Sequence, residues 1–425
     1  MPAATVPPGR LTRGFAAFRH RNFRLFWTGQ LGSLVGTWMA TVARAWLVLE
    51  LTNDPLALGI VAAAQFTPVL VLGLLGGVLA DVVPKRRALI ALQTVMCLNA
   101  FLLAALVVAG VAELWMIVAL TAVLGLANAM EMPTRQAFVM DMVGRDDIAN
   151  AVALNSAAFN GSRIVGPAVA GLLIAFVNLE AALVIDAFSY LAAIAALVAI
   201  DPARLYGGQR GTVPRAAGAI AAQLAEGLRY VRGTPAVLLP ITLLGLVSVA
   251  GMNFQVLIPV MARDVLRAGP DGYGFLLAAA GLGSLSAALA IAFGLRPSRG
   301  LLLGGALAFG VLETFFALSR VFPVSLVLMF GMGFGVIAIA ATVNTTIQLS
   351  APDHLRGRVM SVYVTVFAGS TPIGGLISGS IASAWGAPAA LVVGGVVSMA
   401  VGLAGIGVAG GLGGPLTARL RDRRL

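Results

Sequence analysis

The sequence predicts an all-α polytopic membrane protein with twelve transmembrane helices in two six-helix bundles. Of its 425 residues, 59% are hydrophobic and only 11% are charged, which is more apolar side chain than a soluble fold can bury. The apolar residues form stretches of about 20 residues, the length that crosses a bilayer as a helix. The net charge of +11 comes from basic residues between these stretches, which indicates membrane topology and not a nucleic-acid interface.

The longest internal break divides the chain into an amino-terminal bundle, 25–200, and a carboxy-terminal bundle, 236–410. A basic and aromatic segment, 1–24, precedes the first bundle, and a basic tail, 411–425, follows the second. The helices are expected at 25–50, 56–80, 88–111, 114–137, 150–177, 179–200, 236–262, 272–295, 300–319, 322–349, 358–384 and 387–410.

The break itself, 201–235, is rich in proline and glycine before it becomes amphipathic. Leu224, Leu228 and Val231 recur on one side of a helical projection, while Glu226 and Arg229 occupy the other. This pattern suits a helix that lies on the cytoplasmic membrane surface and tethers the two bundles.

Lysine and arginine accumulate in the loops of one side of the predicted bundle, and the other side has only Arg263, Arg267 and Arg320. Because positive residues stay on the cytoplasmic side, we expect the protein in the cytoplasmic (inner) membrane with both termini in the cytoplasm. The first apolar run is too long for a secretory signal and is expected to be retained. The aromatic and arginine residues before it suit contact with membrane lipid headgroups.

An internal repeat relates the two bundles. Residues 145–148, followed by Gly161 and Gly166-Pro167, resemble residues 352–355, followed by Gly369 and Gly374-Gly375. Both copies open the fifth helix of their bundle, so the halves are expected to be parallel repeats about an axis normal to the membrane. Many secondary transporters alternate access around a central site between such halves.

Residues 77–87, GVLADVVPKRR, connect the second and third predicted helices. This segment resembles the cytoplasmic signature of the major facilitator superfamily, with Val82 and Pro84 as departures from the usual arginine and glycine. The alternative is that the basic run is only a topology anchor. The candidate residues here are Gly77, Asp81, Lys85, Arg86 and Arg87.

The fifth predicted helix contains SRIVGPAVAG at 162–171, which resembles the antiporter motif of the same superfamily. Gly166 and Gly171 would let two helices pack closely, and Pro167 would let the helix bend. The alternative is generic packing of small residues, which is common in membrane helices.

Further segments, among them FRHRNFRLFWTGQLGSLVGTWM and EGLRYVRGTPAV, resemble the drug-efflux branch that includes macrolide efflux pumps and the enterobactin exporter, the transmembrane secretion effectors. The resemblance covers most of the amino-terminal half and the linker. It implies the major facilitator fold and proton-coupled export of an amphipathic small molecule. It also implies a cavity lined by helices one, four, seven and ten, with two, five, eight and eleven beside them.

Ionisable residues within the spans are the best site candidates, because a charge in hydrocarbon is costly and is usually functional or paired. With the cavity-lining helices that the resemblance implies, Arg44, Glu131 and Arg163 are favoured as substrate or proton pathway groups. Asp186 and Glu313 are secondary, because they lie on helices expected at the periphery. Glu131 is the expected proton-exchanging carboxylate. The alternative is a structural ion pair between Glu131 and Arg135, one helical turn apart.

Neutral amides could add hydrogen bonds to a substrate. Asn253 and Gln255 lie on the seventh predicted helix and Asn344 on the tenth. Interhelical hydrogen bonding is the alternative role for such side chains.

The sequence lacks the residues and motifs that disulfides, cysteine-based metal sites, nucleotide binding and hydrolysis would need. The one cysteine, Cys97, excludes disulfides and cysteine-based metal sites within the chain, and no P-loop or HExxH motif is present. The GxGxxG at 405–410 follows no strand, so we expect no dinucleotide, cofactor, metal or enzyme activity. We expect a monomeric exporter that uses protons. An importer of a small metabolite and a non-transporting membrane scaffold or sensor are the alternatives.

Overall fold

The computed structural model describes residues 14–206 and 217–411, except for the side chains of 73–82, 217–223 and 409–411. The described part is helical, and twelve of its helical segments are long and apolar enough to cross a membrane. The prediction of an all-α membrane protein is therefore confirmed.

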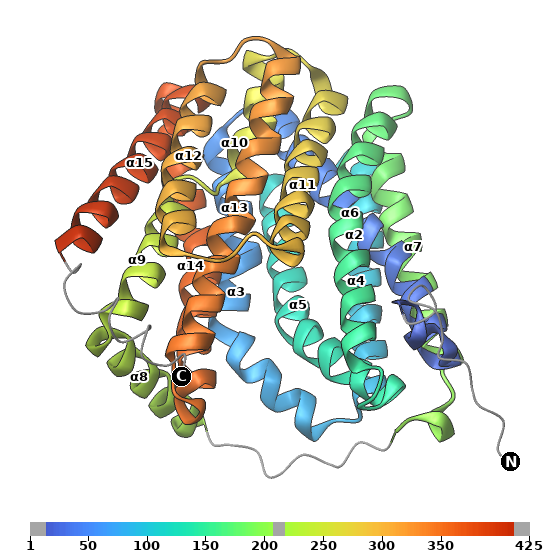
Figure 1. Ribbon diagram of the computed structural model, residues 1–425. Coiled ribbons are helices and arrows are strands. Elements are labelled where there is room, and N and C mark those ends of the chain that lie inside the picture. Colours follow the sequence, from blue (N-terminus) through green and yellow to red (C-terminus); the bar gives the residue numbers. More distant parts are fainter. Residues whose placement is uncertain (1–13, 207–216, 412–425) are drawn as a thin grey trace, which may run out of the picture.

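The amino-terminal half, α2 to α7, and the carboxy-terminal half, α9 to α15, stand side by side (Figure 1). The helices of the first half are α2 (Arg21–Thr52), α3 (Pro55–Val82), α4 (Lys85–Val108), α5 (Leu114–Val143), α6 (Ile148–Phe176) and α7 (Leu179–Ala199). Those of the second half are α9 (Pro235–Ala250), α10 (Phe254–Val260), α11 (Gly269–Phe293), α12 (Arg299–Leu318), α13 (Phe322–Ser350), α14 (Asp353–Trp385) and α15 (Ala387–Gly411). Short helical turns lie at Ala16–Arg19, Pro202–Arg204 and Met261–Val265, and α8 (Ala217–Gly233) lies between the halves in sequence.

The prediction of one continuous helix at 236–262 is wrong, because the helix is interrupted between α9 and α10. The helix α9 ends at Ala250, and a new helix begins at Phe254. The Asn253 side-chain nitrogen donates a hydrogen bond of 2.8 Å to the carbonyl oxygen of Val249, which satisfies a carbonyl group at the end of α9. Pro259 lacks the N–H group that a helix interior needs, and a π-helical turn follows it at Met261–Val265.

The helix α8 packs against α14. A side chain at Gly227 would collide with the backbone of Arg358, and Glu226 forms an ion pair with Arg358. The Tyr230 hydroxyl group donates to the carbonyl oxygen of Ser350 at 3.1 Å. In the described residues α8 is therefore fixed to the carboxy-terminal half.

Two pairs of helices join the halves through small residues. In the α3–α14 pair, an added Cβ at Gly59 would collide with the carbonyl of Gly375. In the α6–α11 pair, one at Gly274 would collide with the carbonyl of Pro167. Close backbone approach of this kind needs residues without side chains. The halves are thus in contact through two matching seams.

These seams lie toward one end of the molecule. We call the end with Arg21, Lys85 and α8 the basic end, and the end with Asn53 and Asn178 the opposite end; the basic end is at the bottom of Figure 1. Many large apolar side chains around the helices are exposed, among them Trp115, Phe188, Phe315 and Val327. Exposed apolar surface of this extent is that of a protein whose solvent is lipid.

Candidate substrate pocket and proton pathway

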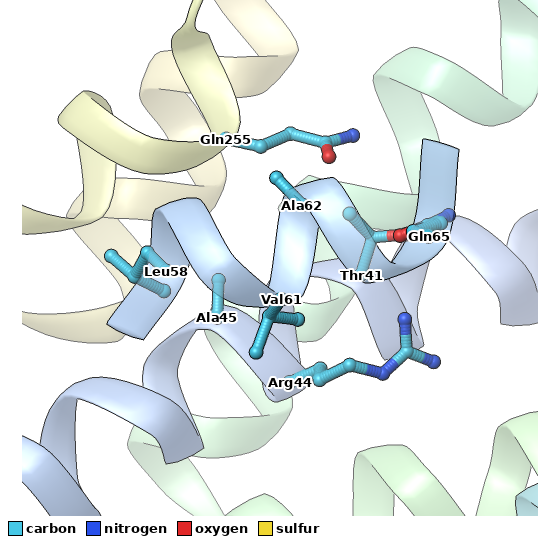
Figure 2. A pocket seen from close by; sticks show the side chains of 8 residues that line it. All are labelled: Thr41, Arg44, Ala45, Leu58, Val61, Ala62, Gln65 and Gln255. Atoms are coloured by element: carbon cyan, nitrogen blue, oxygen red, sulfur yellow. The ribbon is translucent and has the colours of Figure 1, made fainter. Parts of the chain in front are cut away.

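A pocket lies where the two halves meet. It is lined by Thr41, Arg44, Ala45, Leu58, Val61, Ala62, Gln65 and Gln255. The first seven belong to α2 and α3, and Gln255 comes from α10 of the other half, as Figure 2 shows. The pocket therefore has an apolar wall, one cation and two amides, contributed by both halves.

Local structure explains how the polar groups reach this place. Gln255 lies in the first turn of α10, directly after the break, so the break sets the direction of its side chain. The Thr41 hydroxyl group donates to the carbonyl oxygen of Thr37 at 2.9 Å, which leaves its oxygen free to accept. Gln65 lies on α3 where Gly125 of α5 packs against its backbone. A larger residue at position 125 would displace Gln65.

Arg44 is buried, with 7% of its surface exposed, and Asp186 of α7 is its electrostatic neighbour. Asp186 is also buried, and its Oδ1 has no hydrogen-bond partner. Gly36 of α2 makes room for Ser189 and for this carboxyl group, because an added Cβ there would collide with the Ser189 side chain and lie 3.0 Å from Oδ1 of Asp186. The sequence-based expectation placed Asp186 on a peripheral helix. The structure shows that its side chain points into the amino-terminal half.

Glu131 of α5 belongs to a second cluster of polar side chains. Its Oε1 is 3.2 Å from Nε of Arg135, an ion pair without hydrogen-bond alignment. Gln93 of α4 donates to the same Oε1 at 3.4 Å. Tyr190 of α7 lies within electrostatic range of both Glu131 and Asp186. Tyr190 thus lies within electrostatic range of Arg44, Asp186 and Glu131, and all four side chains are buried in the amino-terminal half.

Arg163 and the two remaining amides lie outside the pocket. The Arg163 guanidinium group stacks over the Trp38 ring, 5.6 Å from its centroid, which is a cation–π contact between α6 and α2. Asn253 donates to Val249 within its own break. Asn344 accepts a hydrogen bond of 2.5 Å from Gln348 along α13. Of the three predicted amides, the structure brings only Gln255 to Arg44.

The signature segment fastens helices of the amino-terminal half to each other at the basic end. Lys85 donates to Asp141 of α5 at 2.8 Å. Arg86 donates to the carbonyl oxygens of Leu197 and Val198 of α7 at 2.8 and 2.7 Å, and Arg87 is exposed. Gly77 and Asp81 lie outside the residues whose side chains are described.

The residues of the helix-five motif lie at two different interfaces. Gly166 is pressed against Trp38 and Val35 of α2 in its own half. Gly171 faces α11 of the other half, where an added Cβ would lie 2.7 Å from the carbonyl oxygen of Pro270. Pro167 contributes its carbonyl to the contact with Gly274. Gly171 and Pro167 are therefore part of the seam between the halves.

Four polar residues of these groups were not singled out from the sequence: Thr41, Gln65, Gln93 and Tyr190. Gln65 and Gln93 are single amides within apolar runs, a signal that was available. In the described part of the chain no group of three or more His, Cys, Asp or Glu side chains could hold a metal ion.

Comparison with known proteins gives the family. The model of the transmembrane secretion effectors matches residues 12–409. The multidrug efflux pump Tap of Mycolicibacterium fortuitum is 33% identical over 371 residues, which cover 83% of this chain and 87% of that protein. The staphyloferrin A transporter of Staphylococcus aureus is 26% identical over 172 residues, 40% of this chain and 43% of that protein.

Solved structures of transporters have the same fold. The nucleoside transporter NupG superimposes with a TM-score of 0.72 at 10% identity, over 91% of this chain and 98% of that one. A POT family transporter in complex with 5-aminolevulinic acid gives the same TM-score at 12% identity, over 92% and 96%. These proteins are transporters and not enzymes. The chain belongs to the transmembrane secretion effector family and is a multi-pass membrane transporter of the major facilitator type.

Proposed function

We propose that this transporter exports amphipathic small molecules across the cytoplasmic membrane in exchange for protons. The observation that carries the proposal is the pocket between the halves, in which Arg44, Gln65 and Gln255 face an apolar wall. The cavity volume in the described state is about 20 Å³, room for about one water molecule, so the pocket must widen before this lining binds a ligand with an apolar body and a polar or anionic group. The names of two relatives, a multidrug efflux pump and a staphyloferrin A transporter, support export.

Movement of the halves is the step that moves the ligand. Gln255 belongs to one half and Arg44 to the other, so a relative rotation of the halves separates these groups and weakens binding. Alternating access by rocking of two repeats about a central site has this consequence. The basic end is the cytoplasmic end in this proposal, with both termini there, because positive residues remain inside. The working unit is a monomer.

Glu131 is the proton-exchanging group. It is buried, with 4% of its surface exposed, beside Gln93 and Arg135. A carboxyl group in this setting exchanges a proton when movement of the halves changes its access to water and its distance from the arginine. The electrostatic interactions of Tyr190 with Glu131, Asp186 and Arg44 would couple this event to the pocket.

The test is transport in inverted membrane vesicles, energised by an imposed pH gradient. Three fluorescent amphiphiles serve as probes: anionic anilinonaphthalene sulfonate, neutral phenylnaphthylamine and cationic ethidium. Vesicles with the wild-type protein should accumulate the anionic or neutral probe, because Arg44 faces the pocket. Accumulation by right-side-out vesicles alone would overturn the direction, and failure to move any solute of a wider panel would favour the scaffold.

The variant Glu131→Gln should abolish the pH-gradient-driven accumulation while the protein remains folded. Glu113→Gln is the matched control, because Glu113 is exposed in the loop before α5. Full accumulation by Glu131→Gln vesicles would remove this residue from the coupling mechanism.

A further inference from the structure

Glu313 of α12 is a buried carboxyl group that the proposed mechanism does not use. It has 0% of its surface exposed, and neither carboxylate oxygen has a hydrogen-bond partner. The helices that pack against α12, which are α13 and α15, have no ionisable side chain, and neither do α9 and α10. On α12 itself Arg299 is the first residue, more than three turns away. No charged side chain of these elements compensates Glu313.

The carboxyl group lies against the break between α9 and α10. An added Cβ at Gly251 would lie 2.5 Å from Oε2 of Glu313, and one at Gly394 would lie 2.8 Å from Oε1. The hydroxyl oxygen of Ser398, which is buried and also has no hydrogen-bond partner, lies 3.1 Å from the position of that added Cβ at Gly251. Two glycines therefore let one carboxyl group pack directly against backbone, with a single hydroxyl group nearby.

A glycine also lies near a buried carboxyl group in the other half, but there a cation is present. The spacing from Gly36 of α2 to Pro55 and Gly59 equals the spacing from Gly251 to Pro270 and Gly274. Gly36 faces Ser189 and, slightly farther away, the carboxyl group of Asp186, and Gly251 faces the carboxyl group of Glu313. Asp186 has the guanidinium group of Arg44 as an electrostatic neighbour. Glu313 also faces a glycine of the first span of its half, but it lies on the third span of that half whereas Asp186 lies on the sixth, and it has no cationic side chain beside it.

We infer that Glu313 is a second proton-binding site, placed at the break that positions Gln255. A carboxylate anion without donors in an apolar interior is costly, and it would also face the carbonyl end of α9, where the helix dipole is negative. The direct packing against Gly251 and Gly394 leaves no room for a hydrated ion, so a proton is the cation that fits. Release of the proton requires water, and hence separation of α12 from the break.

The break transmits this change to the pocket. Phe309, one turn before Glu313, stacks on Phe254 with a centroid distance of 6.4 Å and an interplanar angle of 22°. Phe254 precedes Gln255, which lines the pocket with Arg44. Separation of α12 from Gly251 therefore moves the amide that faces the ligand. This inference rests on the proposed proton-driven export for its role in transport, but not for proton binding itself.

Proton binding can be measured without transport. Infrared difference spectra of the purified protein, recorded between acidic and alkaline pH, show the C=O stretch of each carboxyl group that changes protonation. We expect Glu313→Gln to lack one band that the wild type and the Glu113→Gln control retain, and Ser398→Ala to shift the same band. Spectra of Glu313→Gln identical to those of the wild type, or a band that responds to Na⁺ and not to pH, would overturn the inference.

Transport then tests the coupling. In inverted vesicles Glu313→Gln should lower pH-gradient-driven accumulation of anilinonaphthalene sulfonate by about tenfold, within the range of common coupling free energies. Gly251→Ala, which keeps the carboxyl group but forces it from the break, should cause a similar loss. If the wild type moves no probe, the proposed function fails while the infrared result stands. If the wild type moves the probe and both variants do so equally well, the inference fails alone.

Discussion

At the scale of single residues, buried charge is compensated differently in the two halves. In the amino-terminal half Arg44 and Asp186 are electrostatic neighbours, and Glu131 is paired with Arg135. In the carboxy-terminal half Glu313 has no such neighbour among the described residues. Charge in a low-dielectric interior is retained where it is paired or functional. The amino-terminal half therefore contains a network whose members should depend on each other energetically.

A double-mutant cycle of Arg44 and Asp186 tests this dependence. Asp186→Asn leaves the guanidinium group buried without its nearest anion, so it should lower the thermal unfolding temperature more in the wild-type background than in Arg44→Met. The expected coupling free energy is about 0.5–3 kcal/mol, as for residues of one network. The measurement is unfolding in detergent, monitored by circular dichroism. Strictly additive effects would show that the two groups do not interact.

The sequence predicted the pocket residues in part. Arg44 and Gln255 were singled out because charges and amides are rare in apolar runs, and both line the pocket. There is no such signal in the sequence for Thr41, since threonine is compatible with lipid-facing and buried positions alike, whereas Gln65 has the same signal as Gln255. Asp186 was assigned to the periphery because helix order alone does not give the direction of a side chain. Part of the space for this side chain comes from Gly36, which lies 150 residues away in the sequence.

At the scale of elements, the break between α9 and α10 is the feature that hydropathy did not predict. Residues 235–265 form one apolar segment, and a helix interrupted by three residues has the same mean hydropathy as a continuous one. The interruption needs a partner for the carbonyl groups that it frees, and Asn253 supplies one. Hydropathy thus predicts the span, while the contacts of particular side chains determine its interior.

Asn253→Ala should destabilise the protein by about 1–3 kcal/mol, because the part-buried carbonyl group of Val249 loses its donor. Asn160→Ala is the matched control. Asn160 donates to Ser156 in the same i to i−4 pattern, but within the uninterrupted α6. Chemical denaturation in detergent should show a clear loss for the first variant and little for the second. Equal losses would mean that the break does not depend on Asn253.

The seam between α6 and α11 offers a second matched pair. Gly171→Ala should impair transport, because its methyl group meets the backbone of Pro270 and overpacking costs about 1–3 kcal/mol. Gly161→Ala, on the same helix with nothing within 4 Å of the added methyl group, should leave turnover intact and raise stability slightly. The transport rates of both variants are measured in vesicles and compared with probe binding to the purified variants. Unchanged turnover in Gly171→Ala would count against a role of this seam in the cycle.

At the scale of the whole molecule, the contacts between halves are concentrated toward the opposite end. Arg263 donates to the carbonyl oxygen of Leu49 at 3.0 Å, and Trp46 stacks on Tyr273. At the basic end, the ion pairs of Lys85 with Asp141 and of Arg358 with Glu226 do not link the halves. In the described state the two halves are therefore in contact at the opposite end. Export requires a second state in which those contacts separate.

The central claim is that the halves rock about the pocket, and distances between spin labels test it most directly. In a Cys97→Ala background, one pair of labels is placed at exposed Val152 and Phe293 near the basic end, and another at exposed Phe176 and Val321 near the opposite end. Each pair spans both halves. Addition of anilinonaphthalene sulfonate or a change of pH should shorten the first distance and lengthen the second. Distances that stay constant, or that change in the same direction at both ends, would contradict alternating access.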